Sequence, residues 1–562
     1  MPSPPRSIRA RPPQNACSKR ADSTSRNTPT GWRASTTRSK LTSGVDPLLP
    51  PRRDAPLSSR SAPMAPTPKK SPSPSTLRSV GLIAGPVVFF LIMLGQGIEG
   101  LSEAGTAALA ITLLMAIWWL TEAIPIYVTA LVPIVLFPLT GVLPAAETTL
   151  NYGHELIYLF LGGFLLSIAV EKWHLHRRVA LSIIAKVGFE PARLVLGFMV
   201  ATGFLSMWIS NTASAMMMVP IGLAVVTQVA ALTERHQPEI DTSPGGFHFG
   251  MSLMLGIAYS ASIGGIATII GSPPNAIFVG YVDRVHGTTI SFLQWMYYGL
   301  PIAVVGILIA WFYLTKKAYP IRIGGMEGIA NVVDEGLREL GPMRHSERRV
   351  LAIFGLVAGL WVLRGALAPY LSSFGLGGFS DTTVAILGAI LLFIVPSHCE
   401  PGEPLLVWED VREVPWGILL LFGGGLALAS GIEASGLATW LAEGLGFLEG
   451  APGILVILVL VAVVIFLTEV TSNTSTATIF VPVVAILATV VGLHPYTLMI
   501  SVVTAASCAF MLPVATPPNA VVFASNYVTM NDMMRAGLRL NIAFIVLIAL
   551  LGRFWLPVAW GI

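Results

Sequence analysis

Charged residues are scarce in this sequence. Asp, Glu, Lys and Arg make up 11% of its 562 residues, whereas a soluble globular domain carries about 25%. Hydrophobic residues reach 54%, and apolar stretches of about 20 residues, the length that a bilayer core requires, recur along the chain. This balance excludes a soluble globular fold and predicts an all-α polytopic membrane protein.

Cysteine is almost absent, and the few residues present show no pattern. Cys17, Cys399 and Cys508 form no CxxC pair and share no metal-ligand spacing, which excludes a disulfide framework. No cluster of His, Asp and Glu has the spacing of a hydrolytic metal centre. We therefore expect neither an enzyme nor a catalytic residue, and we expect no nucleic-acid partner.

The first 78 residues form a basic segment. They contain fifteen Lys or Arg residues against three Asp, and they are rich in Ser, Pro and Arg. Because such a segment can bury little apolar surface, we predict a disordered tail over residues 1–78. A basic arm on anionic lipid is the functional alternative. A start at Met64 would remove most of the segment.

Thirteen apolar segments follow the tail, and two of them are too long for a single span. Segments 192–230 and 453–492 each correspond to about 60 Å of helix, twice the hydrocarbon thickness of about 30 Å. Ser-Asn-Thr interrupts each at its centre, so we predict two re-entrant helical hairpins. The other segments are expected at 79–98, 106–122, 126–143, 153–171, 249–282, 293–315, 348–365, 382–397, 416–432, 497–527 and 538–560.

The distribution of Lys and Arg predicts the topology. Both residues concentrate in the loops after the fourth and seventh segments, whereas the loops at 99–105, 144–152, 433–452 and 493–496 contain neither. By the positive-inside rule, we predict eleven transmembrane helices plus two re-entrant hairpins, with the N-terminus cytoplasmic and the C-terminus outside. The expected location is a bacterial inner membrane.

An internal repeat organises the chain. At an offset of 262, residues 159–175 match 421–437 at seven of seventeen positions, and FLSMWISNTASA aligns with FLTEVTSNTSTA. GSPPNA at 271–276 aligns with ATPPNA at an offset of 244. Each half holds five spans and a hairpin, an odd number of spans, so we predict inverted repeats with a central site. The expected divisions are a first transmembrane helix at 79–104, a first repeat at 105–315, a cytoplasmic linker at 316–347 and a second repeat at 348–562.

The two Ser-Asn-Thr motifs, at 210–212 and 472–474, are the strongest site candidates. Ser, Asn and Thr are favoured N-cap residues, so each motif can direct the positive end of the following helix toward the membrane centre. That end attracts an anion, and the free carbonyls of the preceding helix suit a small cation. A single copy indicates an ordinary cap, but two copies at one repeat offset favour a binding site.

The Pro-Pro-Asn motifs at 273–275 and 517–519 predict unwound backbone inside two further apolar segments. Tandem prolines break a helix, and unwound backbone at that depth occurs where it is buried or lines a cavity. Among nearby carboxylates, Glu122 is expected at a solvated helix end. Glu469, four residues before Asn473, is either a functional ionisable group or a structural hydrogen-bonding group.

Over about residues 79–562, the chain resembles the divalent anion:sodium symporters. The resemblance lies in the paired Ser-Asn-Thr motifs, in WWLTEAIPIYVTALVP at 118–133, and in the spacing of Ser507, Phe510, Pro513 and Asn519 followed by Ala-Val-Val. It implies sodium as the coupling ion at two or more sites, small dicarboxylate anions as partners, a homodimer in the lipid bilayer and an elevator-type movement.

The resemblance also implies individual site residues. The first sodium site would comprise Ser206, Ser210, Asn211 and Gly271, and the second Thr468, Thr471, Asn473 and Ala515. Thr471 would contribute only its backbone carbonyl. The anion would bind between the two tips, near Ser210, Asn211, Thr212, Ser272, Ser472, Asn473, Thr474, Thr516 and Pro517.

The leading functional hypothesis is sodium-coupled symport of C4-dicarboxylates such as succinate, fumarate or malate. Two separated helix ends suit two separated carboxylates. A sodium-independent dicarboxylate exchanger, or a sulfate or citrate carrier on the same fold, is the alternative within the transporter class. An anion channel, or a membrane-bound structural or sensor protein, is the alternative from a different class.

Overall fold

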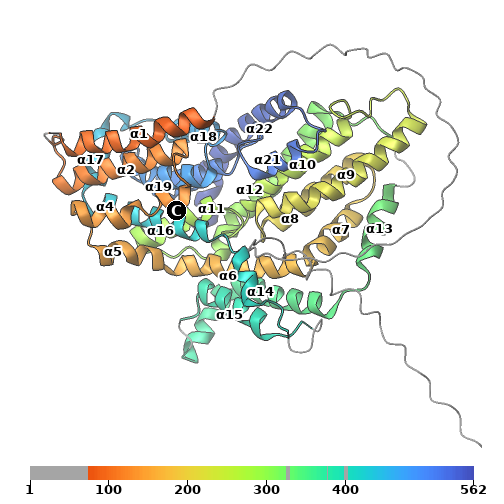
Figure 1. The fold of residues 1–562 in the computed structure, drawn as a ribbon, viewed down its shortest axis with the longest axis horizontal. Helices are drawn as coiled ribbons and strands as arrows, with labels where there is room; N and C mark the ends of the chain where they lie inside the picture. The colour runs from red at the N-terminus through yellow and green to blue at the C-terminus, as the bar shows by residue number, and fades with distance from the viewer. Residues whose placement is uncertain (1–73, 96, 325–328, 376–377, 398–402) are drawn as a thin grey trace, which may run out of the picture. The chain divides into compact units, whose positions relative to one another are not determined.

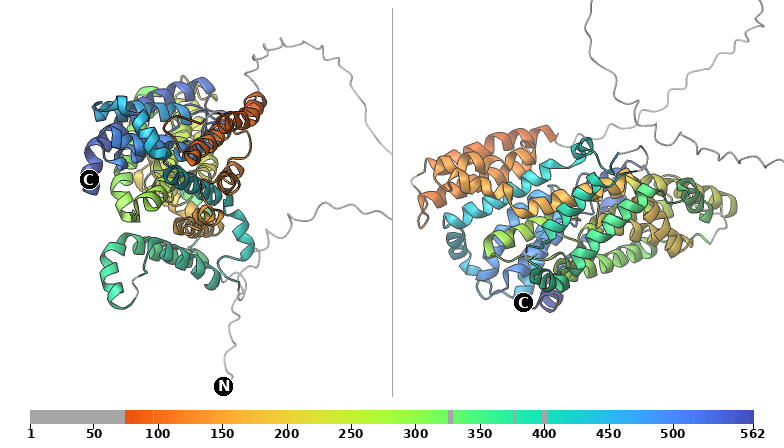
Figure 2. Two further views of the ribbon diagram at one scale, coloured as in Figure 1. Left: turned by 90° about the vertical axis from the view of Figure 1, so that its left-hand side faces the viewer. Right: turned by 90° about the horizontal axis from the view of Figure 1, so that it is seen from below.

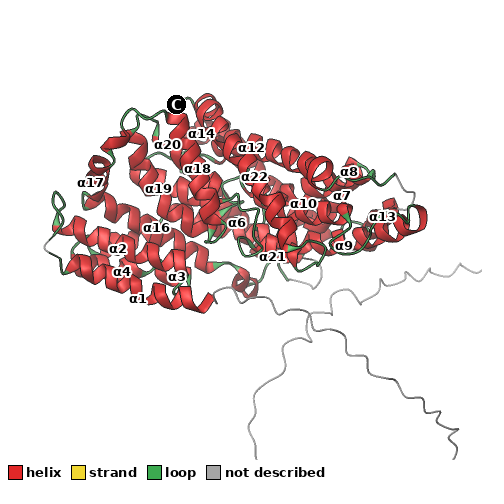
Figure 3. Ribbon diagram, turned by 90° about the horizontal axis from the view of Figure 1, so that it is seen from above, coloured by secondary structure: helices red, strands yellow, loops and turns green. Residues whose placement is uncertain are grey.

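The computed structural model describes residues 74–95, 97–324, 329–375, 378–397 and 403–562. In this part of the chain, helices are joined by loops and there is no β-strand (Figure 3), which confirms the all-α prediction there. The predicted tail lies outside the described residues as far as residue 73, and so do Cys17 and Cys399.

The first half of the described chain begins with two long helices packed side by side. Breaks near 207–210 and 266–272 divide two of its later apolar segments. The helices are α1 (Pro74–Met93), α2 (Glu103–Thr121), α3 (Ile126–Thr129), α4 (Val132–Thr140), α5 (Ala145–Leu150), η2 (Asn151–Gly153), α6 (Glu155–Lys172), α7 (Leu175–Val187), α8 (Pro191–Ser206), α9 (Asn211–His236), α10 (His248–Gly265), α11 (Pro273–His286), α12 (Phe292–Phe312) and the π-helical turn η3 (Tyr313–Ala318).

The second half shows corresponding breaks near 469–472 and 507–516. Its helices are α13 (Ile329–Leu340), α14 (His345–Ser373), α15 (Asp381–Ile394), η4 (Trp408–Glu413), α16 (Trp416–Ala434), α17 (Leu437–Gly444), η5 (Gly446–Leu448), α18 (Gly453–Thr468), α19 (Asn473–Val490), α20 (Pro495–Ala506), α21 (Pro517–Phe523), α22 (Met530–Leu550), η6 (Leu551–Trp555) and α23 (Leu556–Trp560).

Length and hydropathy make nine helices of the described chain long and apolar enough to cross a membrane. Five shorter apolar helices accompany them. Three of the five, Pro191–Ser206, Gly453–Thr468 and Pro495–Ala506, end at breaks. The other two, Ile126–Thr140 and Asp381–Ile394, lie elsewhere in the chain. The count of eleven spans and the inversion of the repeats stay predictions.

The predicted interruptions of both long apolar segments are confirmed as helix breaks. Residues 192–230 fall on α8 and α9, which lie side by side, and 453–492 fall on α18 and α19. Figure 1 shows α8, α9 and α10 as neighbours. The first segment continues six residues beyond its expected end, because α9 runs to His236.

Several expected loops contain helices that hydropathy did not indicate, including α5 in the loop at 144–152 and α13 in the linker at 316–347. α7 occupies the basic loop after α6, and its Arg178 forms an ion pair with Glu347 of α14 at 2.7 Å. Lys172, the last residue of α6, forms an ion pair with Asp410 of η4 at 2.6 Å. α17 lies in the expected loop at 433–452. Short helices with one polar face lack the continuous apolar run by which spans are recognised.

Two clusters of buried hydrophobic residues hold the helices together. One lies among α1, α2, α4, α16 and α17, and the other extends from α6 through α16 and from α18 to α23, including both broken segments. α14 and α15 pack against each other, and α15 packs on α6 (Figure 2). Exposed apolar side chains such as Ile83 and Leu91 on α1 match a surface whose solvent is lipid.

Candidate functional site

The first Ser-Asn-Thr motif lies where α8 gives way to α9. Ser210 is the N-cap of α9, and its hydroxyl accepts a hydrogen bond from the Ala213 amide at 3.1 Å, as a capping side chain does. Ser210 is exposed, whereas Asn211 and Thr212 are half-buried. The free amide groups of the first α9 turn are therefore within reach of a ligand at this break.

Asn211 faces a group of oxygen atoms. Its Oδ1 lies 2.5 Å from Ser206 Oγ, which in turn lies 2.7 Å from the Ala261 carbonyl oxygen. The carbonyl oxygens of Ala261 and Gly271 both lie 3.2 Å from the position of this Asn211 atom. With the amide turned over, its NH₂ group would donate to all three oxygens. With Oδ1 inward, the Asn211, Ser206, Ala261 and Gly271 oxygens face one another, and oxygen atoms are the ligands that a small hard cation favours.

Two glycines allow the backbone to approach this oxygen cluster closely. A Cβ on Gly265 would lie 2.5 Å from Asn211 Oδ1 and 2.8 Å from the Gly271 carbonyl oxygen. A Cβ on Gly271 would lie 2.6 Å from the Gly265 carbonyl oxygen and 3.0 Å from that of Ser206. No larger residue fits without displacing the oxygens, so glycine here serves close approach.

The second Ser-Asn-Thr motif repeats part of this arrangement between α18 and α19. Thr468 Oγ1 lies 2.7 Å from Asn473 Oδ1 and 3.0 Å from the Ala506 carbonyl oxygen, as Ser206 does between Asn211 and Ala261. Ser472 is the N-cap of α19 but makes no side-chain cap hydrogen bond, so the predicted capping bond is present only at Ser210.

Thr471 uses its hydroxyl within its own tip. Thr471 Oγ1 donates to the Leu467 carbonyl oxygen at 2.9 Å and lies 2.8 Å from Thr476 Oγ1. The hydroxyl is thus engaged, which leaves the backbone carbonyl as the group available to a ligand. Ala509 and Ala515 stand where the first half has Gly265 and Gly271, so this oxygen cluster lacks the paired glycines.

The two Pro-Pro-Asn motifs begin α11 and α21, and their asparagines hold the unwound loops. Asn275 Nδ2 donates to the carbonyl oxygens of Gly265 at 3.0 Å and Thr268 at 2.7 Å. Asn519 Nδ2 donates to the carbonyl oxygens of Ala509 at 3.1 Å and Leu512 at 3.0 Å. The predicted unwinding at both motifs is confirmed, and one amide supports each loop.

Glu469 fastens the second tip to the loop after α20. Its Oε1 accepts hydrogen bonds from the Phe510 amide at 2.7 Å and from Asn541 Nδ2 at 2.8 Å. Oε2 accepts from the amides of Met511 at 3.0 Å and Leu512 at 3.1 Å. The side chain is 3% exposed. Of the two roles expected for this carboxylate, these contacts favour the structural hydrogen-bonding role.

The first half makes the matching connection with different groups. Met207 occupies the position that corresponds to Glu469, and its carbonyl oxygen accepts a hydrogen bond from Thr268 Oγ1 at 2.5 Å. Thr268 also accepts from the Gly271 amide at 3.1 Å. Sequence reasoning did not identify Thr268, Gly265 or Asn541, because their partners lie far along the chain. The repeat alignment, extended outward from each Pro-Pro-Asn motif, carries no signal for Gly265 and Thr268, because Ala509 and Leu512 stand at the corresponding positions.

Ser272 brings the two halves of the chain together. As N-cap of α11, it lies with its hydroxyl 3.0 Å from the Ser507 hydroxyl at the end of α20. Ser272 and Thr516, the N-caps of α11 and α21, are buried, whereas Pro517 is exposed and Thr474 and Ala515 are half-buried. The residues expected near the anion thus lie at the first turns of four helices, two from each half.

Neutral groups dominate these helix ends. In the described chain, the five ion pairs involve neither the Ser-Asn-Thr nor the Pro-Pro-Asn motifs. An anion bound there would be held by hydroxyl, amide and backbone N–H groups and by any cation bound beside it.

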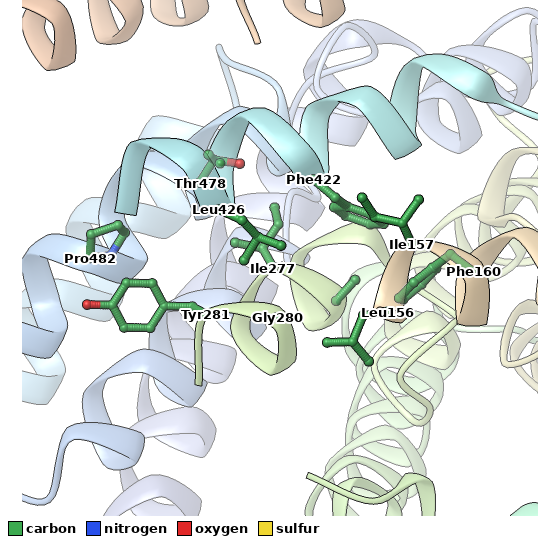
Figure 4. Close-up of a pocket in the computed structure, with 12 residues that line it drawn as sticks. Leu156, Ile157, Phe160, Ile277, Gly280, Tyr281, Phe422, Leu426, Thr478 and Pro482 are labelled. Atoms are coloured by element: carbon green, nitrogen blue, oxygen red, sulfur yellow. The ribbon is translucent and has the colours of Figure 1, made fainter. Parts of the chain in front are cut away.

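A separate apolar cavity lies between α6, α11, α16 and α19. It is small, with a volume of about 20 Å³, and Figure 4 shows the side chains around it. Phe160, Phe422, Leu426 and Ile277 line it, and Thr478 and Tyr281 bring the few polar atoms. Because its lining is apolar, this cavity is unsuited to an ion or a dicarboxylate.

Comparison with known proteins shows that the chain is similar to membrane transporters over most of its length. The sodium:sulfate symporter transmembrane region matches residues 76–561. A sodium-dependent dicarboxylate transporter, SdcS, of Staphylococcus saprophyticus is 43% identical over 496 residues, which cover 88% of this chain and 94% of the relative. SdcS of Staphylococcus aureus is 43% identical over 495 residues, with the same coverage.

Among solved structures, the Alcanivorax borkumensis YdaH transporter is similar with a TM-score of 0.49 and 14% sequence identity. The match covers 74% of this chain and 88% of the other.

Proposed function

Because the chain belongs to the sodium:sulfate symporter family, the divalent anion:sodium symporters, we propose that it is a secondary active transporter that couples sodium entry to dicarboxylate uptake. Membership makes the chain a membrane transporter and not an enzyme. The names of the 43% identical relatives support both the sodium dependence and the dicarboxylate class. The observation that carries the proposal is the duplicated oxygen cluster at Asn211 and Asn473.

Each oxygen cluster is proposed to bind one sodium ion. At the first, Asn211 Oδ1, Ser206 and the Gly271 carbonyl would provide oxygen ligands, with Ser210 at the adjoining helix start. At the second, Asn473 Oδ1, Thr468 and the carbonyls of Thr471 and Ala515 would do so. A bound cation favours Oδ1 turned inward, because an inward NH₂ group would repel it.

The anion is proposed to bind between the tips of the two helical pairs. α9 and α19 both begin at a Ser-Asn-Thr motif, and their positive ends offer two separated places for two carboxylates. Thr212, Ser272, Thr474, Thr516 and Pro517 would complete the surroundings. Sodium at each tip would add the positive charge that the motifs lack. This arrangement favours C4-dicarboxylates such as succinate, fumarate and malate over the smaller sulfate.

The movement is proposed to be of the elevator type, in inverted repeats. α11 and α19 carry site residues, and they meet α6 and α16 across the apolar cavity lined by Phe160, Phe422 and Leu426. Apolar surfaces can slide without leaving hydrogen bonds unpaired, which supports movement at this boundary. The homodimer and the cytoplasmic N-terminus stay predictions.

Competition for labelled succinate in proteoliposomes tests the substrate class. Unlabelled fumarate and malate are expected to compete strongly, citrate and sulfate weakly. Competition by sulfate without competition by fumarate would contradict the dicarboxylate assignment. Flux that fails to saturate with succinate would favour a channel over a carrier.

A further inference from the structure

A surface groove away from the proposed transport site runs between α12 and α22. Val305, Leu308 and Phe312 of α12 form one wall, and Leu540 and Ala543 of α22 lie opposite. The groove holds about 910 Å³ of space that is open to the outside. Leu308 is 47% and Phe312 52% exposed, so a substantial apolar surface faces outward along both helices.

Two cations close one end of this groove. Lys317 and Arg539 both line it, one from each wall, and both are exposed. Neither takes part in any of the ion pairs within the described residues. The groove therefore combines a positively charged end with apolar walls.

The π-helical turn brings Lys317 to the groove. η3 follows α12 directly, and the Tyr319 amide donates to the Leu314 carbonyl oxygen at 2.9 Å, five residues earlier. In a π-helical turn, residues five apart lie on about the same face of the helix, so Lys317 lies on the same face as Phe312. Lys316, its neighbour, does not line the groove.

The charged end belongs to the side that the Lys and Arg distribution predicts to be cytoplasmic. Lys317 is the second residue of the basic linker at 316–347. α22 begins at Met530 on the same side, because the Tyr319 hydroxyl donates to the Asp532 carbonyl oxygen. The inner leaflet contains anionic lipids, and basic pockets between transmembrane helices at that face bind their head groups.

We propose that the groove between α12 and α22 binds an anionic glycerophospholipid, with its phosphate between Lys317 and Arg539 and an acyl chain along Leu308, Phe312 and Ala543. Arg and Lys are the side chains that bind phosphate oxygens, and the apolar walls match a hydrocarbon chain. A soluble anion would use only the charged end, whereas the lipid uses the whole groove. The proposal does not depend on the substrate or the coupling ion.

Lipid retention by the purified full-length protein tests this site. The protein is reconstituted in phosphatidylcholine containing a minor fraction of phosphatidylglycerol, extracted again, and the bound lipids are counted by mass spectrometry. Lys317→Gln with Arg539→Gln is the groove variant. Lys316→Gln with Arg535→Gln is the matched control, because both residues are exposed on the same elements but do not line the groove.

The wild type and the control pair are expected to retain phosphatidylglycerol in preference to phosphatidylcholine. The groove pair is expected to lose this preference by up to about 30-fold, since each surface cation contributes about 1 kcal/mol to binding anionic lipid. Ala543→Phe, which fills the apolar part and keeps both charges, is expected to reduce retention as well. Single variants replace either pair if its elution shows aggregation.

Three results would overturn the proposal. Unchanged preference in the groove pair would show that the two cations hold no lipid. Equal losses in the groove and control pairs would assign the preference to general surface charge. Full release of phosphatidylglycerol by excess glycerol phosphate, with no effect of Ala543→Phe, would reduce the site to a soluble-phosphate site without a lipid groove.

Discussion

Asn275 and Asn519 support the two unwound loops in the same way. Each amide donates to the carbonyl oxygens of the residues ten and seven positions earlier in the chain. Both side chains are completely buried. The two halves of the chain therefore build the same kind of loop beside each oxygen cluster, although the residues around the clusters differ.

Replacement of Asn275 or Asn519 by Ala or Asp is expected to lower thermal stability in a fixed order. Ala leaves two buried carbonyl groups without a donor, at about 1–3 kcal/mol for each group. Asp also directs a carboxylate at those carbonyls, so it is expected to be the more damaging change. Melting of the detergent-solubilised variants measures this, and a milder effect of Asp than of Ala would contradict the assigned donors.

Asn211→Ala and Asn473→Ala are each expected to abolish sodium-driven uptake while the protein still folds. The partner hydroxyls of Ser206 and Thr468 keep their bonds to the carbonyl oxygens of Ala261 and Ala506. Uptake by purified variants of equal melting temperature is the measurement. Asn531→Ala, at an exposed position on the first turn of α22, is the control. Uptake near the wild-type rate in either variant would remove that asparagine from the site.

Gly265→Ala is expected to weaken sodium binding at the first cluster by at least tenfold. The added methyl group would lie 2.5 Å from Asn211 Oδ1 and 2.8 Å from the Gly271 carbonyl oxygen, two of the proposed sodium ligands. Gly359→Ala on α14 is the matched control, because nothing lies within 4 Å of its Cβ position. The sodium concentration that gives half-maximal uptake reports the effect. Equal values for both variants would show that Gly265 does not border a cation site.

Glu469→Gln is expected to lower the melting temperature together with uptake. A Gln amide group would face backbone N–H donors where the carboxylate accepts hydrogen bonds, so at least one buried donor would lose its acceptor, at about 1–3 kcal/mol. Glu443→Gln, at an exposed position of α17, is expected to be neutral. Lost uptake with an unchanged melting temperature would instead indicate an ionisable group that acts in transport.

Hydropathy and the repeat alignment were sufficient to predict where helices break. The Ser-Asn-Thr and Pro-Pro-Asn motifs carry local signals, since capping residues and tandem prolines act on the backbone around them. The four breaks lie at those motifs for this reason. α5, α7, α13 and α17 were not predicted, because short helices with polar residues resemble loops on a hydropathy scale.

The side-chain partners could not be predicted from the sequence. Glu469 meets Phe510 and Asn541, which are 41 and 72 residues away, and Ser272 meets Ser507 across 235 residues. Such pairs depend on how the helices pack, which no local pattern records. The partners of Glu469, which favour a structural role, were therefore visible only in the three-dimensional contacts.

Sodium-gradient-driven succinate uptake into proteoliposomes tests the central claim most directly. The wild-type protein is expected to accumulate succinate above its external concentration when sodium is high outside, and to lose this accumulation when potassium replaces sodium. Even with high sodium outside, Asn211→Ala and Asn473→Ala should each fail to accumulate succinate, as the wild type fails when potassium replaces sodium. Accumulation that is unchanged by replacing sodium with potassium would contradict sodium-coupled transport.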